Sequence, residues 1–252
     1  MGLNALLWDV DGTLAETEFH GHRQAFNQAF AAAELPWRWD ETIYRELLAI
    51  SGGRERIRHF LEHHQGAFVP ASLVESLMAA KQEAYANLAR SGSLPLRPGV
   101  KRLVGEAADQ GIPQALVTTS SRSAVAALLE GHDPALARAF AFWICGEDVR
   151  TKKPSPEGYQ HALDRLKLPS TEVLALEDSP QGLTAARAAS LPCLLTLAEQ
   201  STSEEGSPWW HGATAAVNHL GDDLTPTKVL LGPPCQGKRI TFSWLQQLVE
   251  NP

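Results

Sequence analysis

The hydrophobic and polar positions of the chain begin with the pattern of a buried strand and continue with a helical pattern. Residues 3–8 (LNALLW) form a short apolar run bounded by polar residues, which is typical of a strand inside a sheet. From residue 16 to 33 large apolar side chains recur every three or four positions, which predicts a helix that Thr17 could cap. Further helical patterns follow, over residues 40–50, 54–64 and 71–90. The stretch between residues 15 and 94 contains no strand pattern, so we expect an all-helical block there.

Strand and helix patterns alternate after residue 94. Four apolar runs are typical of buried strands, and they occupy residues 114–120, 139–146, 172–179 and 192–197. A helical pattern precedes each of them, over residues 99–110, 122–130, 156–167 and 180–189. This alternation predicts a parallel sheet covered by helices on both faces.

The simplest assembly joins the strand at residues 3–8 to the later sheet. The expected fold is therefore α/β, with a Rossmann-like parallel-sheet core made of residues 1–15 and 95–252 and an inserted all-helical domain at residues 16–94. Hinges are expected at residues 14–16 and 94–98.

The C-terminal part of the chain has a weaker pattern. We expect a loop over residues 198–210, a short edge strand within residues 213–220 and a final helix over residues 241–250. No role for residues 198–252 follows from the sequence.

Composition and charge indicate which kinds of partner the protein can bind and in which compartment we expect it. The chain has 252 residues, 44% hydrophobic content and a formal net charge of −7, so it has no general attraction for nucleic acid or anionic membranes. Its three cysteines lie far apart, without metal-type spacing. No apolar stretch reaches the ~18 residues that a membrane helix needs, and Asp9 and Asp11 interrupt what would be the apolar segment of a signal peptide. We expect a cytoplasmic monomer that binds a small molecule and neither nucleic acid nor membrane.

Polar side chains follow four of the predicted strands where each strand ends. The residues concerned are Asp9 and Asp11, Thr118 and Thr119, Lys153, and Glu177 and Asp178. Ligands of open parallel sheets bind beyond the carboxyl ends of the strands. We therefore expect these side chains to meet in one crevice.

This combination of acids, a hydroxyl group and an ammonium group suits phosphoryl transfer. Neighbouring carboxylates repel one another unless a hard cation lies between them, and Mg²⁺ prefers oxygen ligands. Lys153, Thr118 and the cation could compensate the charge of a phosphate. One carboxylate can attack phosphorus, and a second can move the proton of the leaving group and later that of water.

Four ordered stretches resemble the motifs of the haloacid dehalogenase superfamily: DVDGTL, LVTTS, KKPSPEGY and ALEDSPQGL. The helical insertion resembles the cap domain of that superfamily. Within it, AETEFHGHRQAFNQAF, WRWDETIYRELL, SGGRERI and LPLRPGV are similar to the CbbY group, which is related to β-phosphoglucomutase. The resemblance covers nearly all of residues 5–197.

The resemblance implies roles for the residues at matching positions. Asp9 would be the nucleophile, Asp11 the general acid and base, and Mg²⁺ would bind Asp9, the backbone carbonyl of Asp11, and Asp178. The other implied roles are phosphate binding by Thr118, Thr119, Lys153 and Gly12, and support of the metal ligand by Glu177.

Four residues of the helical block are candidates for contact with the substrate: Glu18, His22, Arg23 and Arg54. Gly52 and Gly53 precede Arg54 in a loop that opens a helix, where backbone amides and a cation favour an anion. Arg54 would then hold a second, non-reacting phosphate, although the group commonly has lysine there. The alternative is that both arginines are solvated on their helices, and for His22 a structural role is an equal alternative.

The resemblance implies a Mg²⁺-dependent phosphatase that converts xylulose-1,5-bisphosphate to xylulose 5-phosphate through an aspartyl-phosphate intermediate. A phosphomutase of the β-phosphoglucomutase type is the first alternative, although Thr13 stands where the known mutase has an aliphatic residue. The second alternative is a sugar-phosphate-binding protein without catalysis. Because Asp9 and Asp11 are both present, this alternative is disfavoured.

Overall fold

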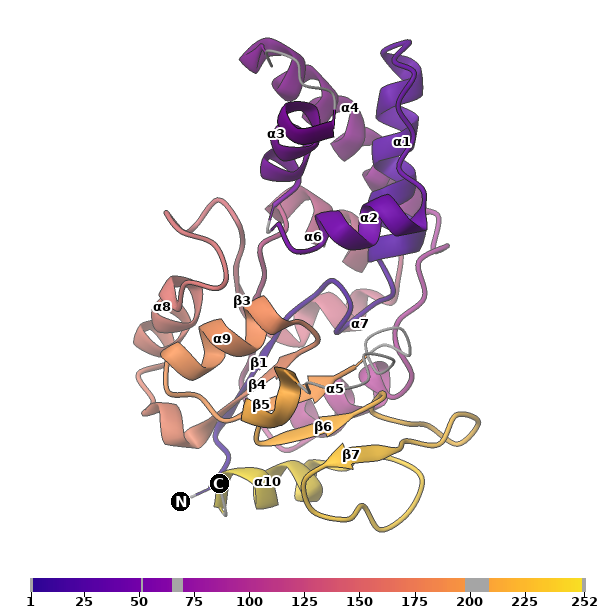
Figure 1. The fold of residues 1–252 in the computed structure, drawn as a ribbon. Helices are drawn as coiled ribbons and strands as arrows, with labels where there is room; N and C mark the ends of the chain where they lie inside the picture. Colours follow the sequence, from indigo (N-terminus) through magenta and orange to yellow (C-terminus); the bar gives the residue numbers. More distant parts are fainter. Residues whose placement is uncertain (1, 51, 65–69, 198–208, 251–252) are drawn as a thin grey trace.

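The computed structural model describes residues 2–50, 52–64, 70–197 and 209–250. Figure 1 shows a sheet with helices around it and a separate group of helices, in indigo and purple, beyond one end of the strands. The predicted α/β class with a largely parallel sheet is confirmed.

Within the described residues, the sheet has seven strands in the order β3-β2-β1-β4-β5-β6-β7. Their bounds are β1 Ala5–Trp8, β2 Gln114–Val117, β3 Phe140–Ile144, β4 Val173–Glu177, β5 Cys193–Thr196, β6 Ala215–Val217 and β7 Val229–Leu231. Neighbours from β3 to β6 are parallel, and β7 is antiparallel to β6. The first strand of the chain is central, because Leu7 pairs with Ala115 of β2 on one side and Ala175 of β4 on the other.

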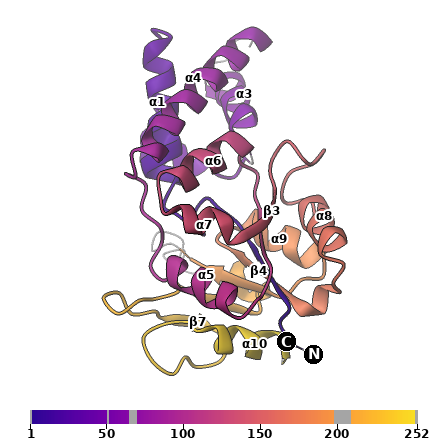
Figure 2. The ribbon, with the colours of Figure 1, turned by 180° about the vertical axis from the view of Figure 1, so that it is seen from behind.

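Helices cover both faces of the sheet, as predicted. They are α5 Val100–Asp109, α6 Arg122–Glu130, α7 Pro134–Arg138, α8 Glu157–Leu166, α9 Pro180–Ala188 and α10 Phe242–Glu250. The residues of β1 alternate between two hydrophobic cores: Leu6 and Trp8 pack with α5, α6 and α10, and Leu7 packs with α8 and α9. Helices α8 and α9 lie in front of the sheet in Figure 1, and α5, α6 and α7 lie in front in Figure 2.

The helical block has its own core. It contains the π-helix Glu18–His22 and the helices α1 Arg23–Ala32, α2 Glu41–Leu47, α3 Gly53–His64 and α4 Ala71–Arg90. Aromatic side chains fill its centre, where Trp39 is fully buried between Phe26, Phe30 and Phe60. Thr17 occupies the N-cap position, as predicted, but its side chain makes no capping hydrogen bond, and its hydroxyl instead donates to Asp11 Oδ1 at 2.6 Å.

Two chain segments connect this block to the sheet, and they lie side by side. Ala15 and Leu96 form an antiparallel bridge. The amide of Glu16 donates to the Pro95 carbonyl at 3.1 Å, and the amide of Arg97 donates to the Leu14 carbonyl at 2.9 Å. The segments expected to act as hinges are thus paired with each other.

The C-terminal part extends the sheet. The predicted final helix is confirmed as α10, but β6 is not the edge strand that we expected from residues 213–220, because β7 pairs with its outer side. β7 has only three residues, all partly exposed, so it lacks the alternation that marks a longer strand. Most of the loop expected over residues 198–210 lies outside the described residues, and a 3-10 helix begins at Trp209. None of the described helices has both the length and the apolar character that crossing a bilayer requires.

Candidate active site

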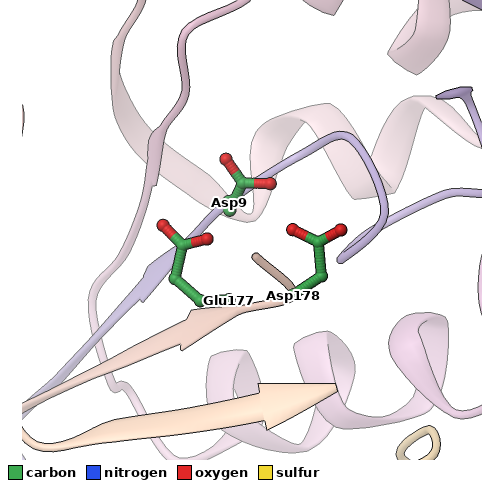
Figure 3. Close-up of side chains that lie close together, drawn as sticks. All are labelled: Asp9, Glu177 and Asp178. Atoms are coloured by element: carbon green, nitrogen blue, oxygen red, sulfur yellow. The ribbon is translucent and has the colours of Figure 1, made fainter. Parts of the chain in front are cut away.

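Three carboxyl groups meet at the carboxyl ends of the two central strands. Asp9 follows β1, while Glu177 ends β4 and Asp178 follows it. One oxygen of each group lies within 4.8 Å of the others (Figure 3). Adjacent parallel strands deliver their ends to the same edge of a sheet, so the strand order places these acids together.

Lys153 is the cation of this cluster. It lies in the loop between β3 and α8, and its Nζ is 2.7 Å from Asp9 Oδ1 and 2.6 Å from Glu177 Oε1. It also donates to the carbonyl of Val117, the last residue of β2, at 2.7 Å. The Tyr159 hydroxyl donates to Glu177 Oε1, whereas Glu177 Oε2 is buried without a hydrogen-bond partner.

Burial and mutual repulsion raise the affinity of the cluster for protons. Burial raises the pKa of Asp9 to about 8, with Glu177 and Asp11 adding to the rise and Lys153 opposing it. Burial and the charge of Asp9 hold the pKa of Asp178 well above its usual value. Although burial lowers the pKa of Lys153, its two acidic partners raise it above the usual range, so it stays protonated. Three carboxyl groups therefore share one ammonium group.

The donor set fits a hard divalent cation. Lys153 and Tyr159 occupy one oxygen of Glu177, which leaves Asp9 and Asp178 as the carboxylates that could hold a metal. The backbone at Gly12 has φ +85° and approaches Asp178 so closely that a Cβ there would lie 2.0 Å from Asp178 Oδ2. Glycine at this position thus brings the loop after β1 against the acids.

Asp11 is held by three hydrogen bonds from side chains. Its Oδ1 accepts from the Thr17 hydroxyl at 2.6 Å and lies 2.8 Å from His22 Nε2, and its Oδ2 accepts from the Ser120 hydroxyl. Burial alone would raise the pKa of Asp11, but His22 and the hydrogen bonds from Ser120 and Thr17 hold it well below its usual value. The carboxylate is therefore kept ionised and aimed by groups from two different parts of the chain.

Lys81 sets the orientation of His22. Its Nζ lies 2.9 Å from His22 Nδ1, and the imidazole ring stacks on Tyr85 at 4.2 Å. Because an ammonium group only donates, Nδ1 accepts, and Nε2 carries the proton that is donated to Asp11. Burial lowers the pKa of Lys81 to about 8, against the opposing charges of Asp11 and Glu18.

Glu18 belongs to a second polar cluster in the helical block. Its Oε2 accepts from the Tyr44 hydroxyl at 2.5 Å and from Arg56 Nη1 at 3.3 Å. Arg56 is fixed in turn by the Ile50 carbonyl, to which its Nε donates at 2.8 Å. Burial would raise the pKa of Glu18, but Arg56 and His22 lower it, so the carboxylate is ionised.

A cavity of about 590 Å³ lies between the helical block and the strand ends, and both clusters line it. Most of the residues singled out in the sequence also line it: Asp9, Asp11, Gly12, Glu18, His22, Arg54, Thr119, Lys153 and Asp178. Glu177 lies beneath this surface, fully buried. Thr118 is also buried, and its hydroxyl accepts from the Ser120 amide at 3.1 Å.

Arg23 is the candidate that the structure places elsewhere. Its Nη2 is 3.4 Å from Glu41 Oε1, and it lines a separate depression together with Trp37 and Arg38. Successive helical residues point about 100° apart. With His22 turned toward Asp11, the next side chain is therefore turned away from the cavity.

Sequence reasoning missed Arg56, Lys81 and Ser120 among the residues that line the cavity. Lys81 had a signal, because it occupies the apolar face of α4 together with Val74, Leu77 and Tyr85 at helical spacing. A lysine on such a face is rarely buried unless it is paired. Ser120 had the signal of its place beside Thr118 and Thr119 at the end of a predicted strand, whereas Arg56 carried none, because its partner Glu18 is distant in the chain.

Comparisons with known proteins agree with this geometry. A model of haloacid dehalogenase-like hydrolases matches residues 3–190. The plasmid-encoded protein CbbY of Cupriavidus necator is 40% identical over 230 residues, which are 89% of this chain and 88% of that protein.

Two crystal structures of CbbY from Rhodobacter sphaeroides are also similar, one in complex with phosphate and one of a mutant in complex with xylulose-(1,5)bisphosphate. Each has a TM-score of 0.78 at 40% identity and covers 86% of this chain and 94% of its own. The chain therefore belongs to the haloacid dehalogenase-like hydrolases, within the group of the CbbY proteins.

Proposed function

We propose that the protein is a Mg²⁺-dependent phosphatase that hydrolyses a sugar bisphosphate through an aspartyl-phosphate intermediate. The observation that carries the proposal is the convergence of Asp9, Asp11, Lys153 and Asp178 on one cavity. These residues come from three loops that follow β1, β3 and β4, and no simpler structural purpose accounts for so much buried charge.

Asp9 is the proposed nucleophile. It would attack phosphorus and form an acyl phosphate, while Lys153, 2.7 Å from Asp9, would bind the transferring phosphoryl group. Thr118, Thr119 and Gly12 would add hydrogen bonds to that group. Glu177 would support the site by holding Lys153, which lies 2.6 Å away.

Asp11 is the proposed general acid and base. It would protonate the leaving oxygen and later take a proton from the water that hydrolyses the acyl phosphate. The hydrogen bonds from Thr17, His22 and Ser120 favour its ionised form, which suits the second step. The first step requires that Asp11 gain a proton once substrate is bound.

Asp9 and Asp178, together with the carbonyl of Asp11, would hold Mg²⁺. The bound cation would neutralise charge on the phosphate and reduce the repulsion between the two carboxylates. The raised pKa values of Asp9 and Asp178 support this, because burial and the neighbouring carboxylates disfavour the ionised forms that a bound cation would stabilise.

Residues 16–94 are proposed to act as a cap over a core of residues 1–15 and 95–252. Closure of the cap would exclude water while the leaving group departs, and the paired segments around residues 14–16 and 94–98 would serve as the hinge. Glu18 and His22 would face the sugar, and Arg54 would hold the second phosphate. Arg23 has no part in this proposal, because it lies outside the cavity.

Xylulose-1,5-bisphosphate, converted to xylulose 5-phosphate, is the proposed substrate. The support is the likeness to the CbbY structure that holds this bisphosphate, at 40% identity over 86% of this chain. The cations Arg54, Arg56 and Lys152 also line the cavity and pair with Glu75, Glu18 and Glu55 rather than with Asp9, so they could bind a second phosphate.

The test is phosphate release in the presence of Mg²⁺ from xylulose-1,5-bisphosphate, ribulose-1,5-bisphosphate, fructose-1,6-bisphosphate and glucose 1-phosphate. We expect selectivity for the first, and no release by the Asp9→Asn variant at unchanged fold. Isomerisation of glucose 1-phosphate without release would indicate a mutase instead. Tight binding without turnover of any ester would indicate a non-catalytic binding protein.

A further inference from the structure

Lys152 and Lys153 are consecutive in the chain, but their side chains serve different parts of the cavity. Lys153 is buried among Asp9 and Glu177. Lys152 reaches the helical block, where its Nζ is 3.0 Å from Glu55 Oε1 and 3.2 Å from Oε2. The loop after β3 thus extends one cation to the candidate catalytic acids and another to α3.

The Lys152–Glu55 pair lies directly against the loop that opens α3. Gly52 has φ +98°, and a Cβ there would lie 2.6 Å from Lys152 Nζ and 2.2 Å from Glu55 Oε2. The ammonium group therefore approaches the Gly52 backbone at van der Waals distance. This is the same loop in which the backbone and Arg54 favour an anion.

Two cations at this end of the cavity are arranged alike. Arg54 and Lys152 line the cavity, whereas their partners Glu75 and Glu55 do not. Arg54 Nη2 is 2.7 Å from Glu75 Oε2, and this pair is about half exposed. The side chain of Lys152 is 26% exposed and that of Glu55 is 43% exposed. Exposed ion pairs are weak, so a dianionic group in the cavity can compete with the carboxylates for both cations.

We infer that Lys152 is a specificity-determining residue that binds the second, non-reacting phosphate of the substrate together with Arg54. The inference rests on the proposed function and assigns a core residue to the distal end of the substrate. Binding of that phosphate joins the core loop to the cap, and it fixes the separation of the two phosphates because neighbouring lysines contact one each. Glu55 keeps Lys152 in position and competes with the ligand.

Two variants distinguish phosphate binding by Lys152 from a purely structural role, in which the Lys152–Glu55 ion pair only holds the cap against the core. Lys152→Met removes the ammonium group that is proposed to bind the phosphate. Glu55→Gln breaks the same ion pair but leaves the lysine free to bind the phosphate. We measure kcat/KM for xylulose-1,5-bisphosphate and for para-nitrophenyl phosphate, which has no second phosphate, and compare their ratio. The ratio should fall at least about tenfold in Lys152→Met, as expected for loss of one charge-assisted contact. In Glu55→Gln it should rise or stay unchanged.

The inference is wrong if both variants change the ratio in the same direction, or if Lys152→Met slows both substrates equally. Lys101→Met is the matched control, because it breaks an exposed pair with Asp133 of 3.1 Å outside the cavity, and it should leave the ratio unchanged. A wild-type protein that releases phosphate from no ester overturns the proposed function. In that case calorimetric titration of the bisphosphate into wild type and Lys152→Met still tests the inference, since equal affinities contradict it.

Discussion

At the scale of single residues, Gly182 shows how tightly the acid cluster is packed. It lies in the first turn of α9, and a Cβ there would be 1.8 Å from Glu177 Oε2. Gly182→Ala should displace Glu177 from Lys153 and Tyr159, destabilise the fold by about 1–3 kcal/mol and lower kcat. Urea denaturation and phosphate release measure the two effects.

Gly105 provides the matched control. It lies in α5, and a Cβ there would meet nothing within 4 Å. Gly105→Ala should stabilise the protein by about 0.5–1 kcal/mol and leave turnover unchanged. Equal effects of the two substitutions would contradict the view that glycine at position 182 is required by Glu177.

The raised pKa of Asp9 makes a prediction for the metal-free protein. Burial raises the pKa of Asp9 to about 8 in the folded protein, whereas an aspartate in the unfolded chain has its ordinary pKa of about 3.8. The folded state binds more protons between these values, so the free energy of unfolding should fall as pH rises from 5 to 8. Each additional bound proton contributes up to about 1.4 kcal/mol per pH unit.

Urea denaturation in EDTA at pH 5, 6, 7 and 8 checks this dependence. Asp9→Asn should show a shallower slope, and Mg²⁺ should reduce the slope of the wild type, because the cation replaces the proton between Asp9 and Asp178. Identical slopes for the wild type and the variant would show that Asp9 is not protonated in this range.

Residues that follow the carboxyl end of a parallel strand could be predicted from the sequence. Asp9 and Asp178 directly follow strands that an apolar run predicts, and Lys153 lies in the loop after a third such strand, so one rule about parallel sheets was sufficient. Arg56 and Arg23 could not be assigned, because the direction of a side chain depends on how its helix is rotated. A π-helix at Glu18–His22 directly precedes Arg23, and no sequence pattern marked it.

At the scale of elements, Arg97 ties the connecting segments to the strand ends. Its buried guanidinium donates to four backbone carbonyls, those of Gly12, Thr196, Leu197 and Asn218. Its Nε also lies 3.0 Å from Glu16 Oε1. A lysine has three donors on one atom and cannot reproduce this fork.

Arg97→Lys should therefore leave about two buried carbonyls unsatisfied and lower the free energy of unfolding by about 2–4 kcal/mol. Arg90→Lys is the control, because Arg90 forms an exposed pair with Glu130 at 3.0 Å. It should change stability by no more than about 0.5 kcal/mol. The urea concentration at the midpoint of unfolding, at an unchanged m-value, measures the stability of each variant. Similar losses of stability in both variants would exclude a specific role for Arg97.

Elements were predictable where they are long or strongly apolar. The strands of the parallel sheet and the helices between them follow from period and burial, as β4 and α5 show. The short β7 was missed because its three residues are all partly exposed and its position depends on pairing with β6. The order of the strands also required tertiary contacts, since β1 lies between two strands that are more than 100 residues away in the chain.

At the scale of the whole molecule, contacts across the mouth of the cavity join the two parts of the fold. Gln181 Nε2 at the start of α9 donates to the carbonyl of Ala49 in the helical block at 3.2 Å, and both residues line the cavity. In the proposed opening of the cap, the hinge around residues 14–16 and 94–98 would separate Gln181 from Ala49 and let substrate enter. Locking the mouth should consequently block turnover without altering the acid cluster.

A protein with cysteines in place of Ala49 and Gln181 tests this. The half-buried Cys235 is first replaced by serine, and Cys145 and Cys193 are buried and should not react. Joining the two new cysteines with a short bismaleimide should lower bisphosphate turnover at least about tenfold, because substrate entry and product release both need an open cap. A monofunctional maleimide on both cysteines is the control for added bulk, and it should lower bisphosphate turnover much less than the link does. A linked protein that turns over as fast as the control with a monofunctional maleimide on both cysteines would show that the mouth does not need to open, and the proposed hinge would then have no part in catalysis.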